Sequence, residues 1–176
     1  MNDFIKAKGM AAFGTRLRRL SERLDRDVQG LYRAHGADFE PRWFPVVMAL
    51  LDRGSLSVGE LASMIGITHA AVSQVRGELI ARGMAHVARD PADGRRQMLE
   101  LSAKARRQCE ILAPLWAAIM RSTEMLCLAE APHLLAELNR LEDALAFKSM
   151  AARVAEQMPP QGSSSTEESY ADRVCG

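Results

Sequence analysis

The chain has 176 residues, of which 48% are hydrophobic, 26% are charged and 5% are aromatic, and its formal net charge is +1. This composition allows a core of ordinary size and excludes a polybasic tail, and the three cysteines are too few for a disulfide scaffold. The longest apolar runs, such as Val46–Leu51, are too short to cross a bilayer, and residues 1–10 lack the apolar stretch of a signal peptide. We therefore expect a cytoplasmic protein without a membrane segment.

The charges are distributed unevenly along the chain. Residues 1–33 and 66–107 each hold eight Lys or Arg against four Asp or Glu, whereas residues 108–176 hold ten acids against five bases. Two basic segments in a nearly neutral chain can present one cationic face to a polyanion. Nucleic acid is therefore a candidate partner in spite of the low net charge.

The first third of the chain has helical periodicity. Apolar residues at helical spacing predict a helix over Phe13–Leu31. The helix breakers Gly36 and Pro41 separate it from a second predicted helix over Arg42–Asp52.

A helix-turn-helix is predicted over Leu56–Arg82. Ser57 and Glu60 have the spacing of a capping box, which marks the start of a short helix that ends at Gly66. Thr68 is a suitable N-cap for the second helix of this motif.

The second helix has one apolar face, formed by Val72, Val75 and Leu79, and an opposite face of small or polar residues. Such a face fits a major groove about 12 Å wide, where Gln can bond adenine, Ser can bond several base edges and Ala can touch a thymine methyl group. A polar face also occurs on helices that bind nothing. The residues of this helix that we expect at DNA are Thr68, His69, Ala70, Ser73, Gln74 and Arg76.

A β-hairpin is predicted next, because two strand-like segments, Met84–Arg89 and Gln97–Leu101, flank the turn-forming run DPADG. A hairpin directly after a helix-turn-helix is the wing of a winged-helix domain, and an arginine at its tip can enter the minor groove. An exposed turn with a surface ion pair is the alternative interpretation. The expected DNA-binding residues of the hairpin are Arg89, Asp93, Arg95 and Arg96, with Asp93 orienting Arg95.

Two further helices are predicted after the hairpin. Ser102 caps a long helix that reaches about Cys127 and contains Pro114 as a kink. Residues 131–132 (Ala-Pro) open a final helix, and residues 159–176 have the composition of a disordered tail. The leucine seam of the final helix consists of Leu134, Leu138, Leu141 and Leu145.

The predicted fold is mainly α with a small β-hairpin wing, an α+β winged helix-turn-helix. The first and last helices have leucine seams that a winged helix of about 50 residues cannot bury. We therefore expect a helical dimerisation domain of residues 10–36 and 102–158 and a DNA-binding domain of residues 41–101, although packing within one chain would also cover the seams. A two-fold dimer would set its recognition helices about 34 Å apart on a palindromic operator.

The segments LSVGELA (56–62), ITHAAVS (67–73) and DPADGRR (90–96) resemble the MarR (multiple antibiotic resistance regulator) family, and the resemblance extends over about residues 10–157. It implies a homodimeric winged-helix regulator with interlocked terminal helices, in which Arg95 enters the minor groove. Residues 17–21 and 39–45 resemble the branch that sometimes precedes an acetyltransferase domain. The chain contains no such domain, so we expect no acetyltransferase activity from it.

The resemblance also implies a small aromatic or anionic effector, because MarR-type regulators commonly release DNA when such a molecule binds between the dimer helices and the winged domain. Aromatic and methionine residues at helical spacing can line such a pocket, but they can equally belong to an ordinary core. A cysteine sensor is not expected, since the peroxide-sensing branch uses a cysteine near the N-terminus and this chain has none before Cys109. The candidate ligand-binding residues are Trp43, Phe44, Met48, Trp116 and Met120.

Catalytic motifs are missing from the sequence: the four histidines are dispersed, and there is no HExxH, no paired-cysteine spacing and no glycine-rich phosphate loop. We expect no enzyme activity, no cofactor and no metal, although dispersed residues could still form a zinc site in three dimensions. The expected function is that of a sequence-specific, nucleoid-associated repressor that binds double-stranded DNA as a homodimer. The alternative is a winged-helix dimer that acts as a protein-interaction module without specific DNA binding.

Overall fold

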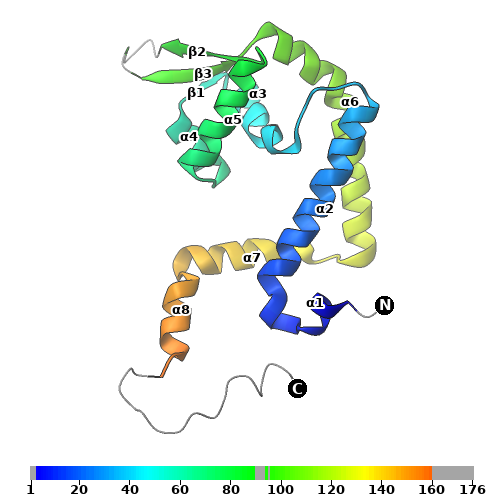
Figure 1. Ribbon diagram of the computed structural model, residues 1–176, viewed down its shortest axis with the longest axis vertical. Coiled ribbons are helices and arrows are strands. Elements are labelled where there is room, and N and C mark those ends of the chain that lie inside the picture. The colour runs from blue at the N-terminus through cyan, green and yellow to red at the C-terminus, as the bar shows by residue number, and fades with distance from the viewer. Residues whose placement is uncertain (1–2, 90–93, 95, 160–176) are drawn as a thin grey trace. The chain divides into compact units, whose positions relative to one another are not determined.

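The computed structural model describes residues 3–89, 94 and 96–159. The chain forms two compact units that divide between Arg121 and Ser122. Helices predominate in the described residues, and the first unit contains one small antiparallel sheet (Figure 1). The predicted fold class, a mainly helical winged helix-turn-helix, is therefore confirmed.

The N-terminal elements are α1 (Phe4–Ala7), the 3₁₀ turn η1 (Gly9–Ala12) and the long helix α2 (Phe13–Ala34). The prediction of α2 is confirmed, whereas the two short elements before it were not predicted. The Asp3 carboxylate caps α1 by accepting backbone N–H bonds, and it also pairs with the Arg19 guanidinium at 2.9 Å. This pair ties the first turn of the chain to the side of α2.

The second predicted helix begins as the 3₁₀ turn η2 (Pro41–Trp43) and continues as α3 (Phe44–Arg53). α3 ends at Gly54, whose φ of +83° suits a residue without a Cβ. The strand β1 (Ser55–Leu56) follows and was not predicted, because two residues carry no periodicity. It exists because it pairs with a strand more than forty residues further along the chain.

The helix-turn-helix consists of α4 (Val58–Ile65) and α5 (His69–Ala81). The predicted capping box is present, since the Ser57 side chain accepts from the Glu60 N–H and the Glu60 side chain accepts from the Ser57 N–H. Gly66 ends α4 in the left-handed conformation, with a φ of +75°. These predictions are confirmed residue by residue.

The wing is formed by β2 (Ala85–Arg89) and β3 (Gln97–Leu101), which pair antiparallel with His86 opposite Glu100. β1 adds to the other edge of β3, so the sheet order is β1-β3-β2. The predicted hairpin strands are confirmed within one residue. Residues 90–93 and 95, at the predicted tip, lie outside the described residues.

The helix α6 (Ala103–Glu130) contains Pro114 and changes direction along its length in Figure 1, as the proline predicts. The Ser102 hydroxyl begins it by accepting from the Ala105 N–H and donating to the Gly83 carbonyl. By length and composition alone, α6 is apolar enough to cross a membrane, which the short apolar runs of the sequence did not indicate. A helix that packs against a partner protein can meet the same criterion, because both settings require an apolar surface.

The second unit contradicts the prediction of one final helix. The segment is divided into α7 (Leu134–Phe147) and α8 (Met150–Gln157), separated by the extended residue Lys148. Ser149 starts a new helix by accepting from the Ala152 N–H, and the Arg153 guanidinium donates to the Ala144 and Lys148 carbonyls. The break leaves the Lys148 carbonyl and the Ala152 N–H, which would bond each other in an unbroken helix, and these are satisfied by the Arg153 guanidinium and the Ser149 hydroxyl. The predicted tail, apart from Pro159, lies outside the described residues.

The core lies in the first unit, between α3, α4, α5, the sheet and the start of α6. An edge-to-face chain of rings crosses it from Tyr32 through Phe39 to Trp43, with centroid separations of 5.2 and 5.7 Å. The largest fully buried side chains are Tyr32, Phe39, Trp43, Leu50, Leu61, Leu79, Met84, Leu99 and Leu112. In the described part of the second unit no residue is buried, so α7 and α8 leave their apolar faces open.

Candidate nucleic-acid interface

The helix α5 has the two faces that its sequence predicts. Val72, Val75 and Leu79 are buried in the core, which fixes the rotation of the helix about its own axis. The side chains on the opposite face are exposed, and they include His69, Ala70, Ser73 and Gln74. The helix therefore presents a rigidly held polar surface of the kind that can enter a major groove.

The N-terminus of α5 is capped as predicted. The Thr68 hydroxyl accepts the Ala71 N–H at 3.2 Å and leaves the first N–H groups of the helix directed outward. Such a helix start attracts phosphate through its N–H groups and its dipole. The ring of His69 lies close to Gly59 of α4, since a Cβ added at Gly59 would be 3.5 Å from the ring. The His69 ring therefore lies next to α4.

Two arginines connect the wing to the helix-turn-helix. The Arg76 Nη2 of α5 donates to the Gln97 Oε1 at the start of β3, at 2.8 Å. The Arg96 Nη2 lies 3.1 Å from the Glu60 Oε1 and 3.4 Å from the Ser57 Oγ. Both side chains were predicted at phosphates, and the structure gives each a protein partner that holds it in place. Within the described part of the chain, Arg89 is exposed and makes no ion pair.

The Glu60 carboxylate has a second task at this junction. Hydrogen bonds from the Ser57 hydroxyl and backbone N–H, with the Arg96 guanidinium beside them, lower the pKa of Glu60 from 4.5 to about 2. The carboxylate is therefore ionised across the physiological range, and through Arg96 it links the start of α4 to the beginning of β3.

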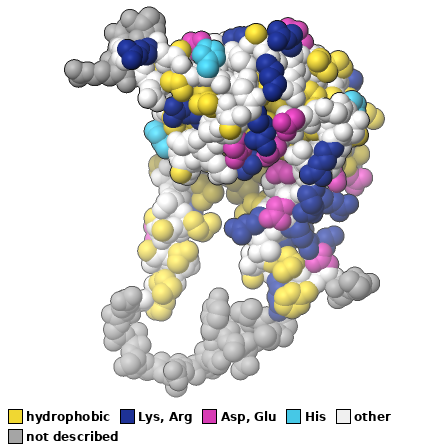
Figure 2. All heavy atoms as spheres, turned by 45° about the horizontal axis from the view of Figure 1, so that its top comes forward, with side chains coloured by type: hydrophobic (Ala, Val, Ile, Leu, Met, Phe, Trp, Pro, Cys, Tyr) yellow, Lys and Arg dark blue, Asp and Glu magenta, His cyan; other side chains and the backbone are white. Residues whose placement is uncertain are grey.

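Asp93 and Arg95, the predicted minor-groove pair, lie outside the described residues. Their roles stay predictions. Figure 2 shows Lys and Arg side chains at several places on the face turned to the viewer, and acidic side chains lie next to some of them. Part of this positive charge is therefore neutralised by ion pairs within the protein, such as those of Arg42, Arg82 and Arg96.

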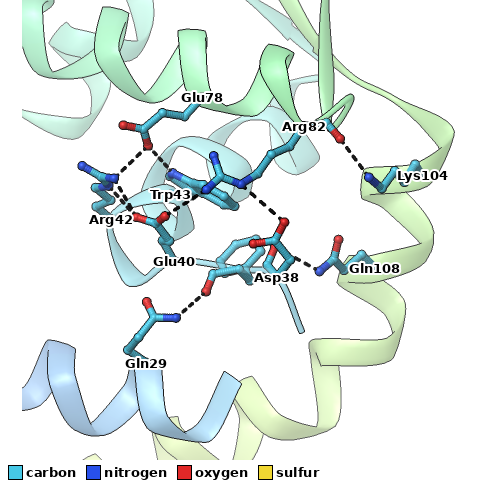
Figure 3. A network of polar contacts seen from close by, with 10 residues as sticks. Gln29, Asp38, Glu40, Arg42, Trp43, Glu78, Arg82, Lys104 and Gln108 are labelled. Carbon is cyan, nitrogen blue, oxygen red and sulfur yellow. Dashed lines mark hydrogen bonds and ion pairs between the residues drawn. The ribbon is translucent and has the colours of Figure 1, made fainter. Parts of the chain in front are cut away.

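A polar network behind α5 was not predicted (Figure 3). The Glu78 Oε2 accepts from the buried Trp43 indole at 2.8 Å and lies 3.1 Å from the Arg42 Nη2. Its other oxygen, Oε1, accepts from the Gln74 Nε2 at 3.2 Å. The Trp43 hydrogen bond is the largest cause of a lowered pKa of Glu78. The network therefore contains a fixed anion next to a predicted base-reading residue.

The same network continues to the end of α5 and to the neighbouring helices. The Arg82 guanidinium lies over the Trp43 ring at 4.6 Å and is 3.4 Å from carboxylate oxygens of both Asp38 and Glu40. The Lys104 ammonium of α6 donates to the Arg82 carbonyl at 2.8 Å. In the sequence, the available sign of this network was that charged residues alternate with aromatic residues in the segment 38–43. Their partners on α5 and α6 could not be known from spacing.

The candidate ligand-binding residues are only partly brought together. Trp43 is fully buried, whereas Phe44 and the half-buried Trp116 meet edge to face at 5.3 Å. The Trp116 indole donates to the Tyr32 hydroxyl at 3.0 Å. Met48 and Met120 are exposed. These contacts show packing within the chain, and an effector site at these residues stays a prediction.

A groove of about 990 Å³ lies along α1, η1 and α2 and was not predicted. Its lining combines apolar side chains, such as Phe13, Leu17 and Leu20, with arginines of α2.

The described residues contain no group of three or more His, Cys, Asp or Glu side chains that could hold a metal ion. Cys109 is buried, and its burial raises the pKa of the thiol, which disfavours the reactive thiolate.

Residues 37–96, which run from the segment before α3 to the residue before β3, match the MarR family model. The resemblance to this family that the motifs indicate is therefore confirmed. A search of curated proteins found no significant match to the chain.

Solved structures share the fold over most of the chain. A probable transcriptional regulator from Pseudomonas aeruginosa is 25% identical with a TM-score of 0.61, and the alignment covers 73% of this chain and 95% of that one. BpsR of Bordetella bronchiseptica, whose DNA binding is regulated by 6-hydroxynicotinic acid, is 28% identical with a TM-score of 0.60, over 74% and 92% of the two chains. A mutant of MarR from E. coli, complexed with operator DNA, is 15% identical with a TM-score of 0.62, over 82% and 99%. The chain thus has the fold of MarR-type DNA-binding regulators.

Proposed function

We propose that this MarR-type winged-helix chain is a sequence-specific DNA-binding repressor that acts as a homodimer and is released by a small-molecule effector. The observation that carries the proposal is the exposed polar face of α5, which is locked against the core by Val72, Val75 and Leu79 and tied to the wing by Arg76. Ser73 and Gln74 contact bases, with His69 and Ala70 beside them. Thr68, Arg76, Arg89 and Arg96 contact phosphates, and Asp93 orients Arg95 in the minor groove.

The homodimer accounts for apolar surface that one chain leaves exposed. Exposed apolar surface is unfavourable in water, and a second copy supplies matching seams. The basic residues of α2 and the acidic charge of residues 108–176 favour pairing between the termini of two copies. The exposed large apolar side chains on α2 are Phe13, Leu17, Leu20, Leu24 and Leu31, and those on α7 are Leu134, Leu135, Leu141, Leu145 and Phe147.

The effector is proposed to be a small aromatic or anionic molecule, by analogy with the regulation of BpsR by 6-hydroxynicotinic acid. Among the candidate residues, the exposed Phe44 and the half-buried Trp116, whose rings meet at 5.3 Å, are the best placed. Aromatic acids are to be screened for release of the protein from its operator. Loss of the response in Phe44→Ala, with DNA affinity retained, is the expected result.

The DNA-binding proposal is tested by nuclease footprinting on the DNA upstream of the chain's own gene, with excess competitor DNA. We expect a protected palindrome whose half-sites lie about 34 Å apart. Gln74→Ala should weaken this protection, and Gln157→Ala, which removes an exposed glutamine at the end of α8, serves as the matched control. Weak, uniform protection that competitor DNA abolishes would contradict specific binding and favour a protein-interaction module. Repression is tested with a reporter gene placed behind the protected DNA. Deletion of the gene for this chain should raise the expression of that reporter.

A further inference from the structure

Gln74 and Glu78 lie one turn apart on α5 and are joined by a hydrogen bond. The Gln74 Nε2 donates to the Glu78 Oε1 at 3.2 Å. Gln74 is exposed on the face proposed to contact bases, whereas Glu78 lies behind it with a side-chain exposure of 21%. The bond therefore joins a surface residue to a group that the fold holds in place.

The Glu78 carboxylate is fixed from its other side. Its Oε2 accepts from the Trp43 Nε1 at 2.8 Å and lies 3.1 Å from the Arg42 Nη2, as Figure 3 shows. Trp43 has no exposed surface, and Arg42 is held in turn by Glu40 at 2.7 Å. These donors keep the carboxylate ionised and restrict its rotation.

An ionised carboxylate can only accept hydrogen bonds, so it determines which way the Gln74 amide faces. One hydrogen of Nε2 is directed to Glu78. The outer edge of the amide then presents Oε1 as an acceptor and the second N–H as a donor. Adenine offers a complementary donor at N6 and acceptor at N7 in the major groove. The reversed amide would place its oxygen against the Glu78 oxygen and is disfavoured.

We propose that Glu78 is a positioning residue that holds the Gln74 carboxamide in the orientation that recognises adenine and thereby sets the base preference at one position of each half-site. This inference rests on the proposed function, in which Gln74 contacts a base. Glu78 itself does not touch DNA in this proposal, and it acts only through Gln74.

Glu78→Gln is the decisive substitution because it keeps the shape of the side chain. Trp43 and Arg42 both donate toward the Oε2 position, so the new amide oxygen stays there and its NH₂ group faces Gln74. Gln74 must then turn its own oxygen inward to accept. Its outer edge presents N–H donors, which match the two acceptors N7 and O6 of guanine. The expected effect is a change of preference from adenine to guanine at that position.

The test is selection of bound duplexes from a library with randomised half-sites, using the full chain. The wild type should select adenine at the position contacted by Gln74, and Gln74→Ala should lose that preference. Glu78→Gln should favour guanine there by about fivefold or more. Glu100→Gln on β3, where Glu100 faces His86, removes the same charge without contact to Gln74 and should select as the wild type does.

The outcomes separate this proposal from the function on which it rests. If no variant, the wild type included, selects a sequence, the proposed DNA-binding function fails. A different outcome is that Gln74→Ala loses the adenine preference while Glu78→Gln keeps it, as Glu100→Gln does. The DNA-binding function then stands, and the positioning role of Glu78 is overturned. The double variant Gln74→Ala/Glu78→Gln should select as Gln74→Ala does, and a separate effect of Glu78 there would also overturn it.

A second variant keeps the proposal testable if Glu78→Gln does not fold by circular dichroism. Glu78→Asp keeps the charge but withdraws the acceptor from Gln74. Its adenine preference should fall without a gain for guanine, and full retention of the adenine preference would overturn the proposal.

Discussion

Trp43→Phe should destabilise the first unit much more than Trp116→Phe, because the two indoles donate to different kinds of acceptor. The Trp43 Nε1 donates to the Glu78 carboxylate at 2.8 Å from a fully buried position. The Trp116 Nε1 donates to the neutral Tyr32 hydroxyl at 3.0 Å from a half-buried one. The two substitutions make the same chemical change, so each serves as the control of the other.

The expected loss in the free energy of unfolding has two parts, the hydrogen bond of the indole and the volume that the smaller ring leaves empty. A hydrogen bond to a charged group contributes about 1.5–3 kcal/mol, against about 0.5–1.5 kcal/mol for a neutral pair. The smaller ring in the closed site of Trp43 adds about 1 kcal/mol. Partial hydration of Glu78 reduces the sum, so we expect a loss of about 2–4 kcal/mol for Trp43→Phe and about 1 kcal/mol for Trp116→Phe.

The assay is urea unfolding followed by fluorescence at equal protomer concentration, since a dimer makes stability depend on concentration. The chain has two tryptophans, so each variant keeps one fluorescent reporter. The pKa of Glu78 is lowered in the folded state, so its stabilising effect is present above pH 4.5 and is lost as the pH falls through the folded pKa. The difference in the free energy of unfolding between wild type and Trp43→Phe should therefore shrink as the pH falls below 4.5. Equal losses in the two variants, or a difference that does not change with pH, would refute the reasoning.

Three further predictions concern α4 and α5. Leu79→Ala should cost about 2–5 kcal/mol in the free energy of unfolding, whereas Ile80→Ala, at the next position but 37% exposed, should cost much less; equal costs in thermal unfolding would contradict the orientation of α5. Thr68→Ala removes the N-cap of α5 and should cost about 0.5–2 kcal/mol by urea unfolding, with Thr68→Ser recovering most of it, and an unaffected Thr68→Ala would show that the cap is dispensable. Glu60 has a pKa of about 2 when folded, so its contribution is present above pH 4.5 and is lost as the pH falls toward 2; Glu60→Gln should flatten the acid limb of the stability curve, and an unchanged limb would argue against the Ser57–Glu60 bonds.

Local signals in the sequence determined the helix-turn-helix. The Ser57–Glu60 spacing, Gly66 and Thr68 predicted where α4 and α5 begin and end, and the structure shows those caps. The apolar period of α5 predicted which of its faces is buried. Caps and periodicity depend on residues within one or two turns, so the chain itself carries them without knowledge of the fold.

Contacts between distant segments were decided by the tertiary structure alone. β1 is a strand only because β3 lies beside it, and the Trp43–Glu78 bond joins residues 35 positions apart. Arg96 was assigned to phosphate from its place in a turn motif, but the fold brings it to Glu60. The leucine seam suggested one final helix, yet at the break the Arg153 guanidinium bonds the Lys148 carbonyl and the Ser149 hydroxyl bonds the Ala152 N–H. A pattern of spacing reports which side chains share a face, and only the folded chain determines which polar groups meet across it.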